Sequence, residues 1–129
     1  MLDYLDTSAL IKLVRAEPES SALRADLSPA SELASSALLG LEARRAAARY
    51  GEPASTRAEA ALAAVTLVPI DTPVLDRAAR LTPVQMRSLD ALHLATALSL
   101  GDDLGRLYCY DERLAAAATA AGVDVRAPR

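Results

Sequence analysis

Two spacings of hydrophobic residues alternate along this chain. In some segments the apolar side chains recur every three or four residues, as on one face of a helix, and elsewhere short apolar runs stand together, as in a buried strand. The helical spacing, with proline or glycine at segment ends, predicts helices over about residues 8–15, 18–27, 37–50, 53–65, 72–81, 90–101 and 111–122. The short runs predict strands over residues 2–5, 33–36, 66–70, 106–110 and 123–125.

The order of these elements predicts the fold class. Strands that alternate with helices are typical of an α/β protein, so we expect a parallel sheet with helices on both faces. Pro69 lies within the strand predicted over residues 66–70, and because proline cannot donate a backbone hydrogen bond, this strand should lie near a sheet edge. At 129 residues the chain has the length of one domain, which we expect to span residues 1–129.

The composition narrows the function classes. With no Phe, no Trp and four Tyr, we expect a core of Leu, Val, Ile and Ala and no surface that stacks bases on aromatic rings. The formal net charge of −3 argues against a basic coat for nucleic acid, although an acidic site that holds divalent cations can still attract phosphate. The one cysteine, Cys109, cannot form an internal disulfide. No apolar stretch approaches the ~20 residues of a membrane span and no signal peptide is evident, so we expect a cytoplasmic protein that does not bind membranes.

Three aspartates occupy similar places in the predicted elements. Asp6 and Asp111 each stand between a strand and a helix, and Asp90 begins a helix. Open parallel sheets bind ligands at the carboxyl ends of their strands, and helix N-termini keep carboxylates ionised. Because aspartate is also a preferred helix cap, each of these residues taken alone is more simply explained as an N-cap.

Glu42 lies in the middle of a predicted helix and is harder to explain as a structural residue. Apolar residues lie one turn before and one turn after it, which places its carboxylate on or beside the buried face. A buried charge requires a partner or a metal ion. Arg45, three residues later, is the ordinary alternative partner.

The chain's single histidine, His93, lies one turn after Asp90 on an apolar helix. A general base is conceivable there, but the apolar surroundings favour a hydrogen-bonded structural histidine. Oxygen donors suit a hard cation such as magnesium, and no Cys–His cluster favours zinc.

Four segments together resemble the motifs of PIN-domain nucleases, especially the VapC toxins of bacterial toxin–antitoxin pairs. They are LDTSALIKL at residues 5–13, SALLGLEAR at 36–44, SLDALHLATA at 88–97 and YDERL at 110–114. The motifs occur in the family's order and span nearly the whole chain. Any one of them alone would be a weak signal, whereas the ordered set is a strong one.

The resemblance implies a three-layer α/β/α PIN-like fold with a short, mainly parallel central sheet and about seven helices. It also implies an endoribonuclease that depends on Mg²⁺, with Mn²⁺ as a substitute, and that cuts structured RNA through Asp6, Glu42, Asp90 and Asp111. Members are commonly homodimers inhibited by a cognate antitoxin protein, which often inserts a basic side chain among the acids. We expect Asp6 and Asp90 to be direct metal ligands, and Glu42 and Asp111 to act through water or to position the nucleophile.

Cys109 departs from the family pattern, which usually has Thr or Ser two residues before the last aspartate. The resemblance therefore leaves in doubt a hydroxyl that would orient a carboxylate or a water there. Ser8 is a candidate for a similar supporting contact.

Two other functions are compatible with the same residues. One is a housekeeping PIN-domain nuclease that processes RNA without an antitoxin. The other is a non-catalytic module that binds RNA or protein, although a pure binder has no need for a cluster of mutually repelling acids.

Overall fold

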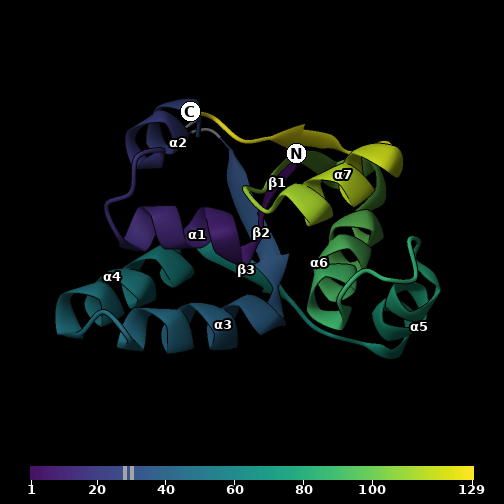
Figure 1. Ribbon diagram of the computed structural model, residues 1–129, viewed down its shortest axis with the longest axis horizontal. Helices are drawn as coiled ribbons and strands as arrows, with labels where there is room; N and C mark the ends of the chain where they lie inside the picture. Colours follow the sequence, from purple (N-terminus) through teal and green to yellow (C-terminus); the bar gives the residue numbers. More distant parts are fainter. Residues whose placement is uncertain (28, 30) are drawn as a thin grey trace.

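The computed structural model describes residues 1–27, 29 and 31–129, and these form a parallel sheet between two layers of helices (Figure 1). The strands are β1 (Leu2–Leu5), β2 (Glu32–Ser36), β3 (Val65–Val68), β4 (Leu104–Tyr108) and β5 (Asp124–Arg126). Neighbouring strands pair in parallel in the order β3-β2-β1-β4-β5. The predicted α/β/α fold is confirmed.

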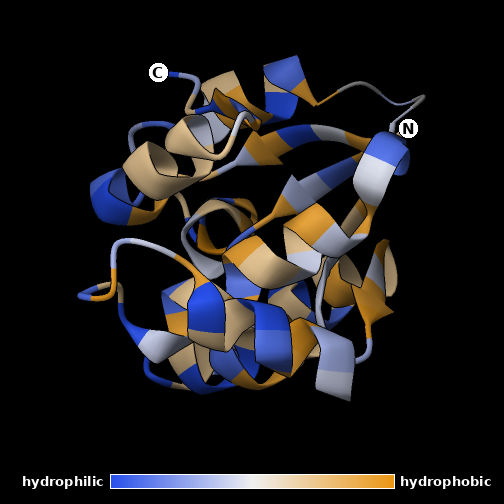
Figure 2. Ribbon diagram, turned by 90° about the vertical axis from the view of Figure 1, so that its right-hand side faces the viewer, coloured by the Kyte–Doolittle hydropathy of each residue, from blue (hydrophilic) through white to orange (hydrophobic). Residues whose placement is uncertain are grey.

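The described part of the chain contains seven α-helices, as predicted. They are α1 (Thr7–Val14), α2 (Ser20–Asp26), α3 (Ala37–Ala48), α4 (Glu52–Ala63), α5 (Thr72–Arg80), α6 (Ser88–Ser99) and α7 (Glu112–Ala120). Helices α1, α3 and α4 lie on one side of the sheet, and α5, α6 and α7 lie on the other (Figure 1). Hydrophilic and hydrophobic residues alternate along the helices in Figure 2, as expected where one helix face is solvated. None of the described helices is long and apolar enough to cross a membrane.

Some element boundaries differ from the predicted ones. β3 begins at Val65, which we expected to end a helix, and it stops before Pro69 because proline cannot continue the hydrogen-bonded ladder. β3 is an edge strand, as its neighbouring proline predicted. β4 begins at Leu104, two residues earlier than expected, directly after a 3-10 helix over Gly101–Asp103 that the hydrophobic pattern did not predict.

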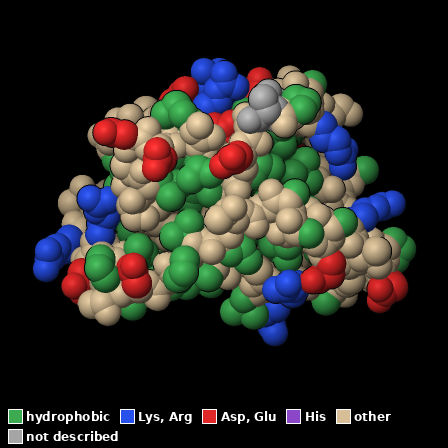
Figure 3. All heavy atoms as spheres, turned by 180° about the vertical axis from the view of Figure 1, so that it is seen from behind, with side chains coloured by type: hydrophobic (Ala, Val, Ile, Leu, Met, Phe, Trp, Pro, Cys, Tyr) green, Lys and Arg blue, Asp and Glu red, His purple; other side chains and the backbone are tan. Residues whose placement is uncertain are grey.

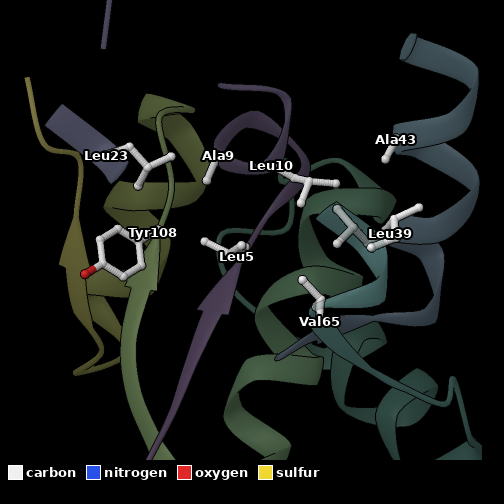
Figure 4. Close-up of a cluster of buried hydrophobic side chains, with 9 residues drawn as sticks. Leu5, Ala9, Leu10, Leu23, Leu39, Ala43, Val65 and Tyr108 are labelled. Atoms are coloured by element: carbon white, nitrogen blue, oxygen red, sulfur yellow. The ribbon is translucent and has the colours of Figure 1, made fainter. Parts of the chain in front are cut away.

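Adjacent residues of the central strands point to opposite helical layers. Leu5 of β1 and Tyr108 of β4 pack in the cluster formed with α1 and α3 (Figure 4), whereas Tyr4 and Leu107 pack against α6 and α7. The expectation of a purely aliphatic core was wrong, because Tyr4 and Tyr108 are both fully buried. Their burial is tolerated since each hydroxyl has a hydrogen-bond partner.

The order of the strands reverses at β1. From β1 the chain proceeds outward through β2 to β3, and then returns to the opposite side of β1 with β4 and β5. Open parallel sheets bind ligands outside the carboxyl ends of strands at such a reversal. The turns that follow β1 and β4 therefore mark the edge where a functional site is most expected.

Candidate active site

Hydrogen bonds join the turns that follow β1 and β4 at the carboxyl end of the sheet. The amide of Asp6 donates to the carbonyl of Tyr108 (3.2 Å), and the amide of Tyr110 donates to Ser8 Oγ (2.9 Å). Asp6 and Asp111, two of the predicted acids, stand in these turns. The strand order thus brings together residues from opposite ends of the chain.

Asp6 is only 3% exposed and has three hydrogen-bond donors. Its Oδ1 accepts from Ser8 Oγ (2.6 Å) and from the amide of Ala9 (2.9 Å), so Asp6 is the N-cap of α1 as well as a candidate ligand. Burial raises the pKa of the Asp6 carboxyl, and the hydrogen bonds from Ser8, Cys109 and Ala9 reduce this rise without cancelling it. The expected contact between Ser8 and a carboxylate is present.

Cys109 stands where the family pattern has a hydroxyl, and its thiol makes the contact that was in doubt. The buried sulfur donates to Asp6 Oδ2 (3.1 Å) and lies 3.4 Å from the carbonyl oxygen of Asp111. Burial and the neighbouring Asp6 carboxylate raise the pKa of the thiol, which therefore stays protonated. Cys109 is thus a hydrogen-bond donor that connects the two turns.

Arg87 connects the other two aspartates. Its Nε lies 3.3 Å from Asp90 Oδ2, and its Nη2 lies 3.3 Å from Asp111 Oδ2. Asp111 also caps α7, because its Oδ1 accepts hydrogen bonds from the amides of Arg113 and Leu114. Asp90 lies in the first turn of α6, where the helix dipole favours a negative charge. One guanidinium group therefore spans the two carboxylates.

Glu42 of α3 is held by side chains from two other helices. Its Oε1 accepts from Thr7 Oγ1 (2.6 Å) and lies 2.8 Å from His93 Nε2. Burial opposes the ionisation of Glu42, but the hydrogen bonds with His93 and Thr7 outweigh it and hold the pKa of this carboxyl below its usual value. The alternative of an ion pair with Arg45 is wrong, because the partners of Glu42 among the described residues are Thr7 and His93.

His93 is a buried, hydrogen-bonded histidine, as the sequence predicted. It is 3% exposed, and its Nδ1 lies 2.8 Å from the hydroxyl of Tyr4. The same ring touches Glu42 through its other nitrogen. His93 therefore links the core to one of the four predicted acids.

The four predicted acids lie at one end of the sheet, but their oxygens face separate partners. Among the residues that the structure describes, no three Asp, Glu, His or Cys side chains already stand in a metal-coordinating arrangement. The reason is that Glu42 faces Thr7 and His93, while Asp90 and Asp111 face Arg87. The side chain of Arg87 is 67% exposed, so its contacts with these two aspartates lie at the surface.

The chemistry of the donors fits magnesium better than zinc. The four predicted acids offer carboxylate oxygens, which a hard cation prefers. The soft donors nearby are engaged, because both ring nitrogens of His93 have partners and the Cys109 thiol stays protonated.

Three residues in these contacts were not predicted from the sequence. Thr7 lies inside the first motif, Tyr4 immediately before it and Arg87 immediately before the third, so only their position beside the motifs could have drawn attention to them. Their partners lie on other elements, and hydrophobic periodicity carries no information about such contacts.

Comparison with known proteins gives consistent results. The family model described as "PIN domain" matches residues 4–120. Ribonuclease VapC46 of Mycobacterium tuberculosis is 49% identical over 125 residues, covering 97% of this chain and 96% of that protein. Ribonuclease VapC47 of the same species is 38% identical over 130 residues, with the same two coverages.

Two solved structures share the fold. A toxin–antitoxin complex from Klebsiella pneumoniae aligns with a TM-score of 0.73 at 21% identity, covering 98% of each chain. The structure of VapC20 from M. tuberculosis, a toxin described as cleaving the sarcin–ricin loop, also aligns with a TM-score of 0.73, at 20% identity, covering 97% of this chain and 99% of that one.

Proposed function

Because this chain belongs to the PIN-domain family and its close sequence relatives are VapC proteins, we propose that it is a Mg²⁺-dependent endoribonuclease acting as the toxin of a toxin–antitoxin pair. Relatives that match nearly the whole chain are named ribonucleases, and a protein of the same fold was solved in a toxin–antitoxin complex. The observation that supports the proposal most is that all four carboxylates lie beside the turns at the carboxyl end of the sheet. Asp6 and Asp111 stand in those turns, Glu42 contacts Thr7 next to Asp6, and Arg87 connects Asp90 to Asp111.

In this proposal Asp6 and Asp90 bind Mg²⁺ directly, with Mn²⁺ as a substitute, and Glu42 and Asp111 act through water or position the attacking water. Such an ion, when bound, lowers the pKa of water and neutralises charge on the phosphoryl oxygens. The chain's own part is orientation. Asp6 is held by donors on both of its oxygens, so its carboxylate keeps one direction and little conformational entropy is lost when a cation binds.

Clustered acids repel one another when no cation is bound. A pair of carboxylates ~4 Å apart at an effective dielectric constant of ~20 costs about 4 kcal/mol. Separately from any repulsion, burial raises the pKa of Asp6, so the ionised carboxyl is unfavourable unless a cation binds it. Magnesium should therefore raise the Tm of the protein, and an unchanged Tm across a saturating titration would contradict the shared site.

The proposed substrate is structured RNA, and the proposed partner is a cognate antitoxin that inserts a basic side chain among the acids. Arg87, which lies between Asp90 and Asp111, supports this idea because it is itself a basic side chain that fits between these carboxylates. Lys and Arg are interspersed with Asp and Glu on the face seen in Figure 3. Because the chain has no Phe or Trp and only four Tyr for stacking on bases, target choice is expected to depend on shape and loops. We further propose that the protein is cytoplasmic and forms a homodimer. Each subunit would consist of one nuclease domain spanning residues 1–129.

An RNA cleavage assay tests the activity. We expect wild type to cut structured RNA only with Mg²⁺ or Mn²⁺, and Asp6→Asn and Asp90→Asn to be inactive. Asp71→Asn is the matched control, because Asp71 caps α5 through the amide of Val74 (3.0 Å) as Asp6 caps α1, but belongs to no predicted acidic set. Equal cutting by all four proteins would refute the assignment.

Co-purification and sequencing of the cleaved RNA ends separate the remaining alternatives. A small DNA-binding protein that co-purifies and blocks cutting supports the toxin, whereas cutting without an inhibitor supports a housekeeping nuclease. RNA binding by wild type without any cutting would support the non-catalytic module.

A further inference from the structure

A buried chain of hydrogen bonds leads from Glu42 into the core. Glu42 Oε1 lies 2.8 Å from His93 Nε2, and His93 Nδ1 lies 2.8 Å from the Tyr4 hydroxyl. The Tyr4 oxygen in turn accepts from the amide of Ser36 (3.1 Å). His93 and Tyr4 are 3% and 0% exposed, so water does not compete for these contacts. The proposed function assigns neither residue a role.

The donors and acceptors along this chain determine where the protons lie. An ionised carboxylate only accepts hydrogen bonds, so the nitrogen that faces Glu42 must carry a proton. The Tyr4 oxygen already accepts from Ser36, and its own proton is free to point toward His93 Nδ1. In an uncharged ring, a proton on Nε2 leaves Nδ1 as an acceptor, and the Tyr4 hydroxyl can then donate to it.

We propose that His93 is a positioning residue for Glu42: Tyr4 donates to Nδ1, and Nε2 donates its proton to Glu42 Oε1. Thr7 donates to the same oxygen at 2.6 Å, so both hydrogen bonds from the described residues end on Oε1. The second oxygen, Oε2, is left to face a cation or a metal-bound water. The inference depends on the proposed function only where it assigns Glu42 to the metal site; the placement of the protons does not depend on it.

The ring proton can be observed directly, because the chain contains one histidine. Long-range ¹H–¹⁵N correlation spectra of metal-free, ¹⁵N-labelled wild type distinguish the Nε2–H tautomer, the Nδ1–H tautomer and the doubly protonated ring. We expect the Nε2–H tautomer. A proton on Nδ1, in the other neutral tautomer or in a doubly protonated ring, would overturn the proposal whatever the protein's activity.

Two substitutions of His93 test its effect on the metal site. In His93→Gln the amide nitrogen reaches about as far as Nε2 and can still donate, whereas His93→Leu fills the space without a donor. We expect Mg²⁺ affinity, measured by titration calorimetry, to fall about 10–100-fold in His93→Leu and to stay within about 3-fold of wild type in His93→Gln. Equal losses in the two variants, or no loss in either, would overturn the positioning role.

Failure of the proposed function would look different from failure of this inference. Thermal unfolding of each variant first establishes that it is folded. If folded wild type bound no Mg²⁺, the metal-dependent function would be contradicted, and the tautomer spectrum would still decide where the His93 proton lies.

Discussion

Replacing Arg87 with glutamine removes the cation that spans Asp90 and Asp111. Arg87 approaches each carboxylate at 3.3 Å, but its side chain is 67% exposed, so solvent screens both pairs. Exposed pairs of this kind contribute ~0.2–1 kcal/mol each, and the two together therefore oppose the binding of another cation by about 0.4–2 kcal/mol. Since 1.4 kcal/mol is a factor of ten in an equilibrium constant, the variant should bind Mg²⁺ about 2–30-fold more tightly than wild type.

Titration calorimetry on metal-free protein at low ionic strength measures this difference. Arg57→Gln is the matched control, because Arg57 is exposed on α4 and its replacement removes the same charge from elsewhere. The difference between Arg87→Gln and wild type should narrow in high salt, since exposed charges are screened. An affinity that is unchanged or weaker in Arg87→Gln would refute the view that Arg87 competes with the metal ion.

Three further substitutions test the site and the core. Asp6→Asn should raise the Tm of metal-free protein at neutral pH. The pKa of Asp6 is raised in the folded state, so the protonated carboxyl favours folding in acid, and this contribution to stability is lost as the pH rises through the folded-state pKa. The uncharged asparagine avoids that loss. A gain that persists unchanged in acid would contradict this reasoning. Cys109→Ala should weaken Mg²⁺ binding about 10-fold or more in calorimetry, while Cys109→Ser, which keeps a donor to Asp6, should stay near wild type; similar losses in both would argue against the hydrogen bond. Leu39→Ala should lower the free energy of unfolding by ~2–5 kcal/mol in urea titrations, because Leu39 is fully buried, and a loss below ~1 kcal/mol would indicate a core that readily collapses.

Much of the fold followed from the sequence because its causes are local. The spacing of apolar residues predicted every α-helix and strand to within a few residues, and proline placed β3 at the sheet edge. The N-capping tendency of aspartate also acts over one turn, which is why Asp6 and Asp111 could be located between a strand and a helix. The start of β3 at Val65 and the buried tyrosines were missed, since tertiary packing overrides local preference there. The end of β3 was also missed, but its cause is local, because Pro69 cannot continue the hydrogen-bonded ladder.

The sequence by itself therefore determined the order of the elements and the set of candidate acids. Only the tertiary structure decided the partner of each acid: Glu42 contacts His93 where Arg45 was the expected alternative, Cys109 contributes a thiol to Asp6, and Arg87 spans two carboxylates. The physical reason is that hydrogen bonds and ion pairs act over a few ångströms, between side chains whose separation along the chain is arbitrary. Which side chains come that close depends on strand order and helix packing, which are properties of the whole folded chain.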